Sequence, residues 1–356
     1  MQLNLSMRIG CHNAVKLIIG LLVLFLACGQ KEQESNRPLD TPALELSGAT
    51  SINNAPLENG QLISLRAVIH YEECESGTAI VPVEVNEDGK FQVSFSQVSL
   101  VNEGSVDCAR NDPKSIEVFA DLNQMVAKTN LEQATLQKAS AGATKGSVTL
   151  DFQETSTLVP TTTSPPDLEI DPRDALRSMR ITREQFDSTS CALQEGCLFA
   201  PGDRRLLRFT TTVRNTGGSE LKIGAPEVHE EFEFSACHKH HHLNDITSYE
   251  LVEKNTRQPA NINGVRVVGR KQGFCFRDSE RFGNGPSTAV FDCELQGLSA
   301  GWTDVYDSTL DCQWLDITDL RPGNYLLRLV VNPTGIFSEM TRVNNVAEIP
   351  VTIPAE

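Results

Sequence analysis

Apolar side chains recur at every second position in several short runs between about residue 44 and residue 154. One run extends from Ile63 to Ile69. Four further runs follow the same period: Val81–Val85, Phe91–Phe95, Ile116–Ala120 and Val148–Phe152. A period of two places the apolar side chains on one face of a β-strand. The sequence therefore predicts a β-sandwich over residues 44–154, and Asp88-Gly89 predicts a hairpin between the second and third runs.

The C-terminal half also contains strand-like segments, and a linker rich in Thr, Ser and Pro precedes it at residues 155–168. The segments are Leu206–Arg214, Leu221–Ile223, Tyr249–Glu253, Gly264–Val268, Trp314–Ile317, Asn324–Asn332 and Val346–Ile353. Asn215–Gly218 predicts a hairpin turn between the first two. Asp174–Glu184 is the only segment with a helical pattern. The whole chain is therefore predicted to be all-β, with a mostly antiparallel second domain at residues 169–356 and little helix.

The N-terminus is typical of an exported protein. Leu17–Ala27 is an apolar run of eleven residues after a basic segment, which is too short to span a bilayer but suits a signal peptide. With Cys28 and Gly29 directly after it, the segment resembles a bacterial lipoprotein signal. The resemblance implies a signal peptide at residues 1–27, lipidation of Cys28, and a flexible tether at residues 28–43.

A lipoprotein signal implies that the protein is extracytoplasmic and lipid-anchored to the cell envelope. Gly29 stands where some lipoproteins carry an inner-membrane retention Asp, which favours the outer membrane. Ordinary secretion with cleavage elsewhere is the alternative. Disulfides persist in either compartment, so Cys74 and Cys108, the two cysteines of the predicted sandwich, are expected to pair.

The chain is acidic, with a formal net charge of −16 at pH 7. Nucleic-acid binding is therefore not expected, because phosphate contacts need a basic surface. An acidic surface attracts cationic partners such as amines or basic peptides, although it also serves solubility alone. None of the ten cysteines forms a Cys-x-x-Cys pair, so a thiolate zinc site is not indicated.

Four of the seven histidines lie in the six residues Cys237–His242. If this run is a β-strand, His238, His240 and His242 share one face. Three imidazoles on one face can then bind one ion at about 2.0–2.1 Å per metal–nitrogen bond. Imidazole suits several metals, so the identity of the ion stays open. A polar loop and a strand face without metal are the alternatives.

Five segments in a fixed order then become recognisable around the histidines. They are Phe234–Glu250 (FSACHKHHHLNDITSYE), Lys271–Asp278 (KQGFCFRD), Gly297–Gly301 (GLSAG), Thr303–Trp314 (TDVYDSTLDCQW) and Asp316–Asn324 (DITDLRPGN). Together they resemble the catalytic domain of the lysyl oxidase family. The resemblance covers about residues 187–353 and does not include the predicted N-terminal sandwich.

The resemblance implies a copper(II) site on His238, His240 and His242. It also implies lysine tyrosylquinone, a redox cofactor made from the protein's own lysine and tyrosine, and the matching residues are Lys271 and Tyr306. Because Tyr306 lies in a polar stretch after a glycine, we expect it on a loop beside the copper. The chain's other two tyrosines in this half are expected to pack in sheets.

The chain departs from the family at three positions near these motifs. Phe234 and Ser235 stand where the family has Trp and His, and Trp302 stands where the animal enzymes have Cys. None of the three is an implied copper ligand, so these departures do not bear on copper binding.

The resemblance also implies three disulfides in the second domain: Cys191–Cys237, Cys197–Cys312 and Cys275–Cys293. An alternative pairing leaves Cys275 and Cys312 without partners, which an oxidising compartment disfavours. Each bridge would stabilise the fold by about 3–5 kcal/mol in the chain-entropy model. The bridges would also brace the loops that carry the implied cofactor residues.

The function implied by the resemblance is a copper-dependent amine oxidase. Such an enzyme converts primary amines, either peptidyl lysine or small amines, to aldehydes with molecular oxygen, and it releases hydrogen peroxide and ammonia. The reaction needs a general base. Asp304 and Asp278 are the nearest candidates by sequence, although each is also typical of a solvated carboxylate or a turn.

Two other functions use the same histidines. One is a non-catalytic copper-binding surface lipoprotein, and the other is a metal-dependent hydrolase or oxygenase that needs neither Lys271 nor Tyr306. The physiological amine cannot be derived from the sequence.

Overall fold

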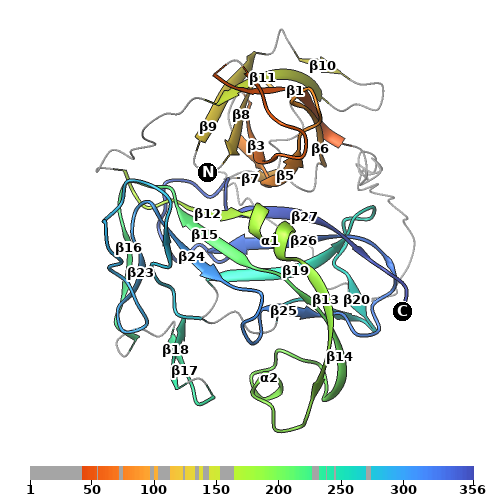
Figure 1. The fold of residues 1–356 in the computed structure, drawn as a ribbon, viewed down its shortest axis with the longest axis vertical. Coiled ribbons are helices and arrows are strands. Elements are labelled where there is room, and N and C mark those ends of the chain that lie inside the picture. Colours follow the sequence, from red (N-terminus) through yellow and green to blue (C-terminus); the bar gives the residue numbers. More distant parts are fainter. Residues whose placement is uncertain are drawn as a thin grey trace, which may run out of the picture. The chain divides into compact units, whose positions relative to one another are not determined.

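The structure is a computed structural model, and it describes thirteen stretches of the chain (Figure 1). These are residues 42–53, 55–71, 75–96, 100–102, 113–122, 125–132, 136–138, 144–152, 164–226, 232–237, 239–243, 246–269 and 274–356. The predicted signal peptide and the lipidation site Cys28 lie outside the described residues, as do Cys74 and Cys108. Residues 38–356 belong to one compact unit. Within the described part, every helix is too short or too polar to cross a membrane.

The described N-terminal residues form two β-sheets. Their strands are β1 (Pro42–Ile52), β2 (Ala55–Pro56), β3 (Leu62–His70), β4 (Glu75–Thr78), β5 (Val81–Glu84), β6 (Lys90–Ser96), β7 (Leu100–Asn102), β8 (Ser115–Leu122), β9 (Met125–Glu132), β10 (Gln137–Lys138) and β11 (Thr144–Phe152). One sheet has the order β10-β11-β1-β2 with β6 also paired to β1, and the other has the order β7-β4-β3-β8-β9 with β5 also paired to β3.

The alternating apolar residues of the sequence form the core of these sheets. Ile63, Leu65 and Ala67 of β3 are completely buried, and Phe91 and Phe95 of β6 are 5% and 1% exposed. All five belong to one hydrophobic cluster. The alternation therefore identified the buried faces of the strands correctly.

The predicted hairpin at Asp88-Gly89 is wrong, although the turn itself forms. The Gly89 N–H donates to the Asn86 carbonyl at 2.9 Å, and Gly89 has a φ of 66°, which glycine adopts readily. However, β5 pairs with β3 and β6 pairs with β1, in different sheets. The turn therefore carries the chain from one sheet to the other. Alternation predicts a buried face but does not predict the partner strand.

The C-terminal half contains two short helices and several small sheets in its described part. The elements are β12 (Leu168–Asp171), α1 (Pro172–Ser178), β13 (Arg180–Phe186), α2 (Cys191–Gln194), β14 (Gly202–Arg208), β15 (Thr211–Asn215), β16 (Leu221–Gly224), β17 (Phe232–Ser235), β18 (His240–Leu243), β19 (Thr247–Glu253), β20 (Asn261–Ile262), β21 (Val265–Arg266), β22 (Glu280–Arg281), β23 (Gln296–Leu298), β24 (Trp302–Tyr306), β25 (Trp314–Asp316), β26 (Gly323–Val331) and β27 (Val346–Ile353). The prediction of an all-β chain with little helix is confirmed.

Three antiparallel sheets organise this half. Their strand orders are β12-β15-β24-β22, β13-β14-β25 and β19-β26-β27. Apolar residues of these sheets, among them Leu207, Tyr249, Leu327 and Ile349, belong to a second hydrophobic cluster. The strand β24, which ends at Tyr306, lies inside the first sheet between β15 and β22.

The predicted helix Asp174–Glu184 is correct only in its first part. Helix α1 begins after Asp171, whose side chain caps it by accepting from the Arg173 N–H, and Pro172 occupies the first turn. The helix ends before Met179. The following residues form β13, because they pair with β14 over seven positions. The sequence analysis also missed α2, a single turn.

The predicted strand Leu206–Arg214 is two strands in different sheets. Strand β14 ends at Arg208 and pairs with β13 and β25, whereas β15 pairs with β12 and β24. The hairpin predicted at Asn215–Gly218 is also wrong, because β16 pairs with β23. The fully buried Asn215 instead anchors the bend: its Oδ1 accepts from the Gly217 and Asp167 N–H groups, each at 3.1 Å.

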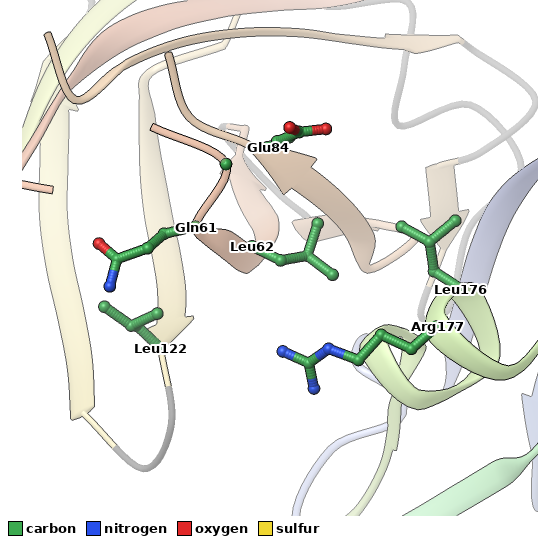
Figure 2. A pocket seen from close by; sticks show the side chains of 7 residues that line it. Gln61, Leu62, Glu84, Leu122, Leu176 and Arg177 are labelled. Atoms are coloured by element: carbon green, nitrogen blue, oxygen red, sulfur yellow. The ribbon is translucent and has the colours of Figure 1, made fainter. Parts of the chain in front are cut away.

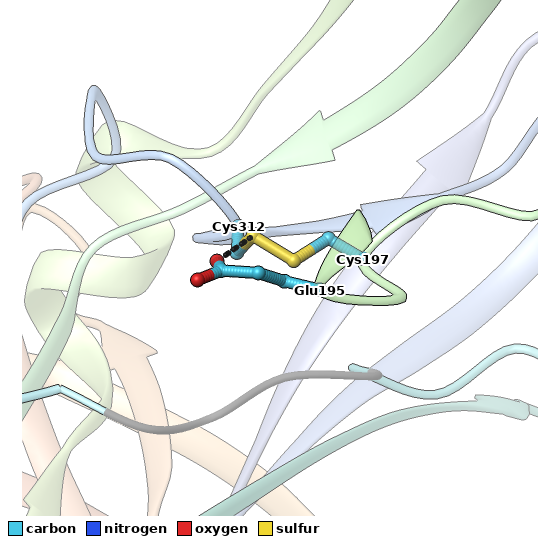
Figure 3. Close-up of side chains that lie close together, drawn as sticks. All are labelled: Glu195, Cys197 and Cys312. Atoms are coloured by element: carbon cyan, nitrogen blue, oxygen red, sulfur yellow. Dashed lines mark hydrogen bonds between the residues drawn. A yellow bond between two sulfur atoms is a disulfide. The ribbon is translucent and has the colours of Figure 1, made fainter. Parts of the chain in front are cut away.

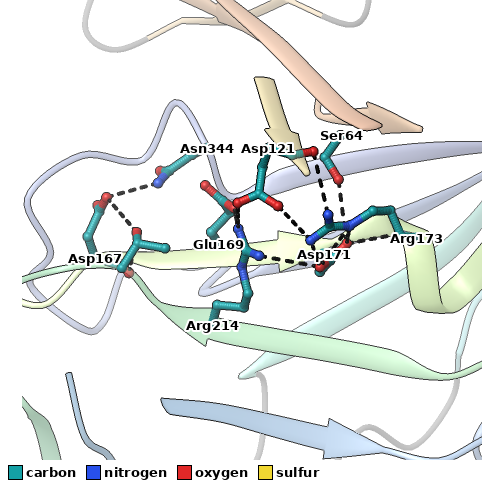
Figure 4. Close-up of polar contacts among 9 residues, drawn as sticks. Ser64, Asp121, Asp167, Glu169, Asp171, Arg173, Arg214 and Asn344 are labelled. Carbon is teal, nitrogen blue, oxygen red and sulfur yellow. Dashed lines mark hydrogen bonds and ion pairs between the residues drawn. The ribbon is translucent and has the colours of Figure 1, made fainter. Parts of the chain in front are cut away.

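A buried ionic cluster joins the sandwich to the C-terminal half (Figure 4). Arg173 and Arg214 are 4% and 6% exposed. Asp121 of β8 contacts Arg173 Nη2 at 2.7 Å and Arg214 Nη2 at 3.2 Å. Glu169 also pairs with Arg214. Burial alone would raise the pKa of Asp171, but the hydrogen bonds from Arg173 and the charge of Arg214 lower it to about 2.

A small cavity opens beside this contact between the sandwich and helix α1 (Figure 2). Its volume is about 370 Å³. The lining residues are Gly60, Gln61, Leu62, Glu84, Leu122, Leu176 and Arg177. Glu84 and Arg177 are its charged groups, and they do not form the kind of convergent polar set that a catalytic site needs.

Candidate metal centre

The histidine run straddles a turn and a strand. Strands β17 and β18 form an antiparallel pair in which Ser235 is opposite His240 and Glu233 is opposite His242. The Lys239 N–H donates to the Ser235 carbonyl at 2.7 Å, and Lys239 has a φ of 59°. Cys237–His242 is therefore not one continuous strand, because the chain reverses direction before His240. His238 lies outside the described residues.

His240 and His242 point to the same side of β18. Their Nε2 atoms are 3.0 Å apart and their ring centroids are 4.8 Å apart. Two nitrogens that each bind the same ion at about 2.0–2.1 Å are about 3 Å apart when the nitrogen–metal–nitrogen angle is close to a right angle. The pair therefore fits two neighbouring ligands of one metal ion, and the same spacing suits a hydrogen bond between the rings when no ion is bound.

The His241 side chain lies on the opposite face of β18 from this pair. The His241 ring packs edge-on against Phe234 of β17, with centroids 5.2 Å apart, and Lys239 is exposed. His242 is 1% exposed, whereas His240 is half-buried. The alternation predicted from the sequence is therefore correct for His240, His241 and His242.

Tyr306 is the last residue of β24 and is only 2% exposed. The expectation that it lies on a loop is wrong, because Tyr306 pairs in register with Thr211 of β15. Thr303 and Asp304, the polar residues just before it, are buried within the sheet, whereas Asp307 after it is exposed. Tyr249 and Tyr325 lie in β19 and β26, as expected, and are 1% and 5% exposed.

One aromatic ring connects Tyr306 with the histidine hairpin. The Phe274 ring stacks on the Tyr306 ring with centroids 4.9 Å apart, and it lies 6.3 Å from the His242 ring. The Leu243 N–H donates to the Phe274 carbonyl at 3.2 Å, which fixes this segment to β18. Phe274 was not predicted as a site residue, because an apolar residue within a motif gives no signal of a stacking contact.

Lys271 lies outside the described residues. In the sequence it is three residues before Phe274, whose ring stacks on that of Tyr306.

The polar surroundings of Tyr306 are dominated by Asp304. Burial raises the pKa of the Asp304 carboxyl to about 7. Burial first, and then the charge of Asp304, also raise the pKa of Tyr306. The two groups therefore lie near each other, although the Tyr306 hydroxyl makes no hydrogen bond of normal geometry with any described residue.

Asp278 has a structural role. Its carboxylate accepts from the Val290 and Ser299 N–H groups, each at 2.8 Å, and from the Ser299 hydroxyl at 2.8 Å. The Phe291 N–H adds a longer contact at 3.4 Å. These bonds hold two loops together and occupy both carboxylate oxygens.

Three disulfides join the elements around the candidate site. They are Cys191–Cys237, Cys197–Cys312 and Cys275–Cys293, the same pairs that the family resemblance implies. The first connects α2 with the turn of the histidine hairpin. The third lies directly after Phe274. The first bridge therefore braces the histidine hairpin, and the third braces the chain directly after Phe274.

A second group of possible metal ligands is not a metal site (Figure 3). Glu195, Cys197 and Cys312 lie close together, but the two sulfurs form a disulfide. Metal binding needs the thiolate, so neither cysteine is available. The Glu195 carboxylate instead accepts from the Ser235 hydroxyl, which links the α2 region to β17.

Comparisons with known proteins find relatives of about half of the chain. The profile of the lysyl oxidase family matches residues 166–354. Protein-lysine 6-oxidase of Homo sapiens is 32% identical over 197 residues, which is 52% of this chain and 45% of that protein. Lysyl oxidase homolog 1 of Homo sapiens is 37% identical over 193 residues, which is 51% of this chain and 32% of that protein.

The matched region is limited to the C-terminal half. The chain spans less than half of the length of these two human relatives. A DUF3823 family protein from Parabacteroides merdae matches at a TM-score of 0.19 and 10% identity, too low to bear on the fold. The family profile, however, covers more than half of the 356 residues. The protein is therefore a member of the lysyl oxidase family.

Proposed function

We propose that this protein is a copper-dependent amine oxidase. It would bind copper(II) through His238, His240 and His242 and carry lysine tyrosylquinone made from Lys271 and Tyr306. Primary amines, either peptidyl lysine or small amines, would be converted to aldehydes with molecular oxygen. The observation that carries the proposal is the 3.0 Å separation of the His240 and His242 Nε2 atoms in a chain of this family.

The donor set fits the proposed metal. Imidazole nitrogen is a suitable ligand for copper(II), and two such nitrogens converge in the described residues. The bound copper and quinone would supply the redox chemistry that no protein side chain provides.

The described residues would place and shield the reacting groups. Phe274 covers one face of the Tyr306 ring at a centroid distance of 4.9 Å, and β15 holds the Tyr306 backbone. The Cys275–Cys293 disulfide fixes the chain directly after Phe274. Because Tyr306 is 2% exposed, little water reaches its ring, which strengthens every electrostatic interaction there.

The acidity and the disulfides support the proposed partners and location. A net charge of −16 favours the approach of cationic amines and lysine side chains. Three disulfides fit an oxidising compartment. We further propose that Cys28 is lipidated and anchors the protein to the outer membrane. The boundaries of the sandwich, linker and catalytic domain at residues 44–154, 155–168 and 169–356 remain predictions.

The proposal is tested by amine-dependent peroxide release. The copper-loaded full chain is expected to release hydrogen peroxide when a primary amine is added, and the Tyr306→Phe variant should bind copper but release none. Tyr325→Phe is the matched control, because it removes the hydroxyl of another buried tyrosine and should keep activity. Copper binding without peroxide release in the unmodified chain would instead support a non-catalytic copper-binding surface lipoprotein.

A further inference from the structure

The buried carboxylate of Asp304 is a charged group that the proposed function has not yet used. Asp304 is 1% exposed and lies two residues before Tyr306 on β24. Side chains two positions apart leave the same face of a strand. The carboxylate and the phenol are therefore neighbours because of the strand itself.

Few donors offset the burial of this carboxylate. The Ser279 hydroxyl donates to its Oδ1 at 3.1 Å, and the Arg277 N–H donates to its Oδ2 at 3.3 Å. The titratable or charged groups that act on it are Tyr306, Tyr249 and Arg277. A buried carboxylate is costly unless it is well compensated, so its retention beside a phenol points to a role in chemistry.

The Tyr306 hydroxyl is itself buried without a normal hydrogen bond to any described residue. An unpaired buried hydroxyl costs about 1–3 kcal/mol. Asp304 is next to it on the strand, so a small movement of the phenol would bring the hydroxyl within donor distance of the carboxylate. The alternative carboxylate, Asp278, is already saturated by loop N–H groups.

We propose that Asp304 is the proton acceptor for the Tyr306 hydroxyl and is therefore a catalytic residue in forming the cofactor. The inference rests on the proposed function. In this step the O–H bond of Tyr306 breaks and an O–H bond forms on Asp304. The electron pair stays on the phenolic oxygen, so the products are a phenolate and a neutral carboxyl group.

The electrostatics of the site suit this transfer when a cation is bound. An adjacent cation favours the phenolate and lowers the pKa of the phenol. A base is most effective when its pKa lies near the working pH, and burial raises the pKa of Asp304 to about 7. Above pH 7 the carboxylate is free to accept the proton, and below pH 7 it is already protonated.

The test follows the formation of the quinone. Copper is added in air to the purified metal-free full chain, and the rate at which the quinone absorbance appears is measured across pH. The rate for the unmodified chain is expected to rise through about pH 7, the pKa of Asp304. The Asp304→Asn variant is expected to form quinone at least tenfold more slowly at pH 8 and to lose this rise.

Asp307→Asn is the matched control, since Asp307 is exposed and its carboxylate accepts hydrogen bonds only from Thr309 among the described residues. This variant should keep the rate and the pH profile. An Asp304→Asn variant with an unchanged rate and profile would overturn the proposal. If the unmodified chain forms no quinone at all, the proposed function fails instead.

Two further measurements do not depend on Asp304→Asn folding, and the second of them needs no copper. Ser279→Ala removes one donor to the carboxylate, so the pKa of Asp304 and the midpoint of the rate profile should shift to higher pH; an unchanged midpoint would contradict the proposal. In the metal-free chain, the infrared carbonyl band of a buried carboxylic acid should titrate near pH 7 and should shift with Ser279→Ala. A titration with no such band would show that Asp304 is not available as a base.

Discussion

At the scale of single residues, neighbouring histidines have different roles because of the geometry of the strand. His240 and His242 converge at 3.0 Å, whereas His241 packs on Phe234. A side chain on the opposite face of a strand cannot reach the same ion. In the proposed site, His240 and His242 are therefore a ligand pair with the packing residue His241 between them, and His238 is proposed to complete the site.

This arrangement gives a prediction with an internal control. His242→Ala should weaken copper binding by more than about 100-fold, because even outer-shell partners of a metal ligand contribute about 10–100-fold. His241→Ala should change the affinity by less than about threefold, because it loses only a ring contact. Titration of copper against a competing chelator measures both. Equal losses in the two variants would show that the ligand assignment is wrong.

The pKa of Asp171 predicts how stability depends on acid. Its pKa is about 2 in the folded chain and 3.8 in its ordinary state, so the unfolded chain binds the proton more readily. The contribution of this group is therefore present above about pH 4 and is lost as the pH falls through about 2. Urea unfolding at pH 5 and pH 3 should show this loss in the unmodified chain, and the loss should be smaller in Asp171→Asn. The same pH dependence in both would contradict the assignment.

At the scale of elements, the histidine hairpin depends on its attachment to α2. Strands β17 and β18 pair only with each other among the described strands. Isolated two-stranded hairpins are marginally stable in water. The Cys191–Cys237 disulfide and the Ser235–Glu195 hydrogen bond both tie this hairpin to the α2 region, so the proposed metal site depends on these attachments.

Removal of the Cys191–Cys237 bridge should therefore affect metal binding as well as stability. The double variant Cys191→Ala/Cys237→Ala removes a bridge between residues that are 46 positions apart in the sequence. In the chain-entropy model this loss lowers the free energy of unfolding by about 4 kcal/mol. Its copper affinity should fall together with its stability. The matched variant Cys197→Ala/Cys312→Ala removes a bridge between residues that are 115 positions apart in the sequence. It should lose slightly more stability but less copper affinity. Denaturant unfolding and copper titration of both variants test this, and a larger copper loss in the second would contradict it.

The sequence predicted strands more successfully than it predicted their partners. Alternation identified the buried face of β3 and the full extent of β27, because a period of two is a local property. Both predicted hairpins were wrong, since the strands on either side of each turn pair with distant strands. Partner choice depends on tertiary packing, which no local pattern contains.

The site shows the same division between local and tertiary information. Spacing alone indicated His240 and His242, and the family resemblance indicated Tyr306. Neither indicated Phe274, whose stacking on Tyr306 depends on a contact across 32 residues of chain. Burial of Tyr306 was also missed, because its polar neighbours suggested a loop, whereas Thr303 and Asp304 pair with β15 within the sheet.

At the scale of the whole molecule, the sandwich is more than an attached domain. Asp121 of the sandwich supplies negative charge to Arg173 and Arg214, which are both buried in the C-terminal half. Arg214 lies on β15, and β15 pairs with the strand that ends at Tyr306. The contact between the two halves is therefore connected to the candidate site through one strand.

Loss of Asp121 should consequently destabilise the protein strongly. Asp121→Ala leaves two buried arginines short of a partner, and removing one member of a buried ion pair costs about 3–5 kcal/mol. Asp88→Ala is the control, because Asp88 pairs with Lys90 on the surface, where the two side chains are 70% and 60% exposed. Exposed ion pairs contribute about 0–1 kcal/mol to stability. Urea unfolding of both variants makes the comparison. A loss below about 1 kcal/mol for Asp121→Ala would show that the ionic cluster does not stabilise the contact.

The most direct test of the central proposal is a phenylhydrazine titration of the full chain, folded oxidatively and loaded with copper in air. Phenylhydrazine reacts with a quinone carbonyl to give a coloured adduct. We expect one adduct per chain, carried by a cross-linked peptide that contains both Lys271 and Tyr306 after digestion. The Tyr306→Phe variant should give none. A folded, copper-loaded chain without adduct would contradict the amine oxidase proposal, and the histidines would then serve copper binding alone.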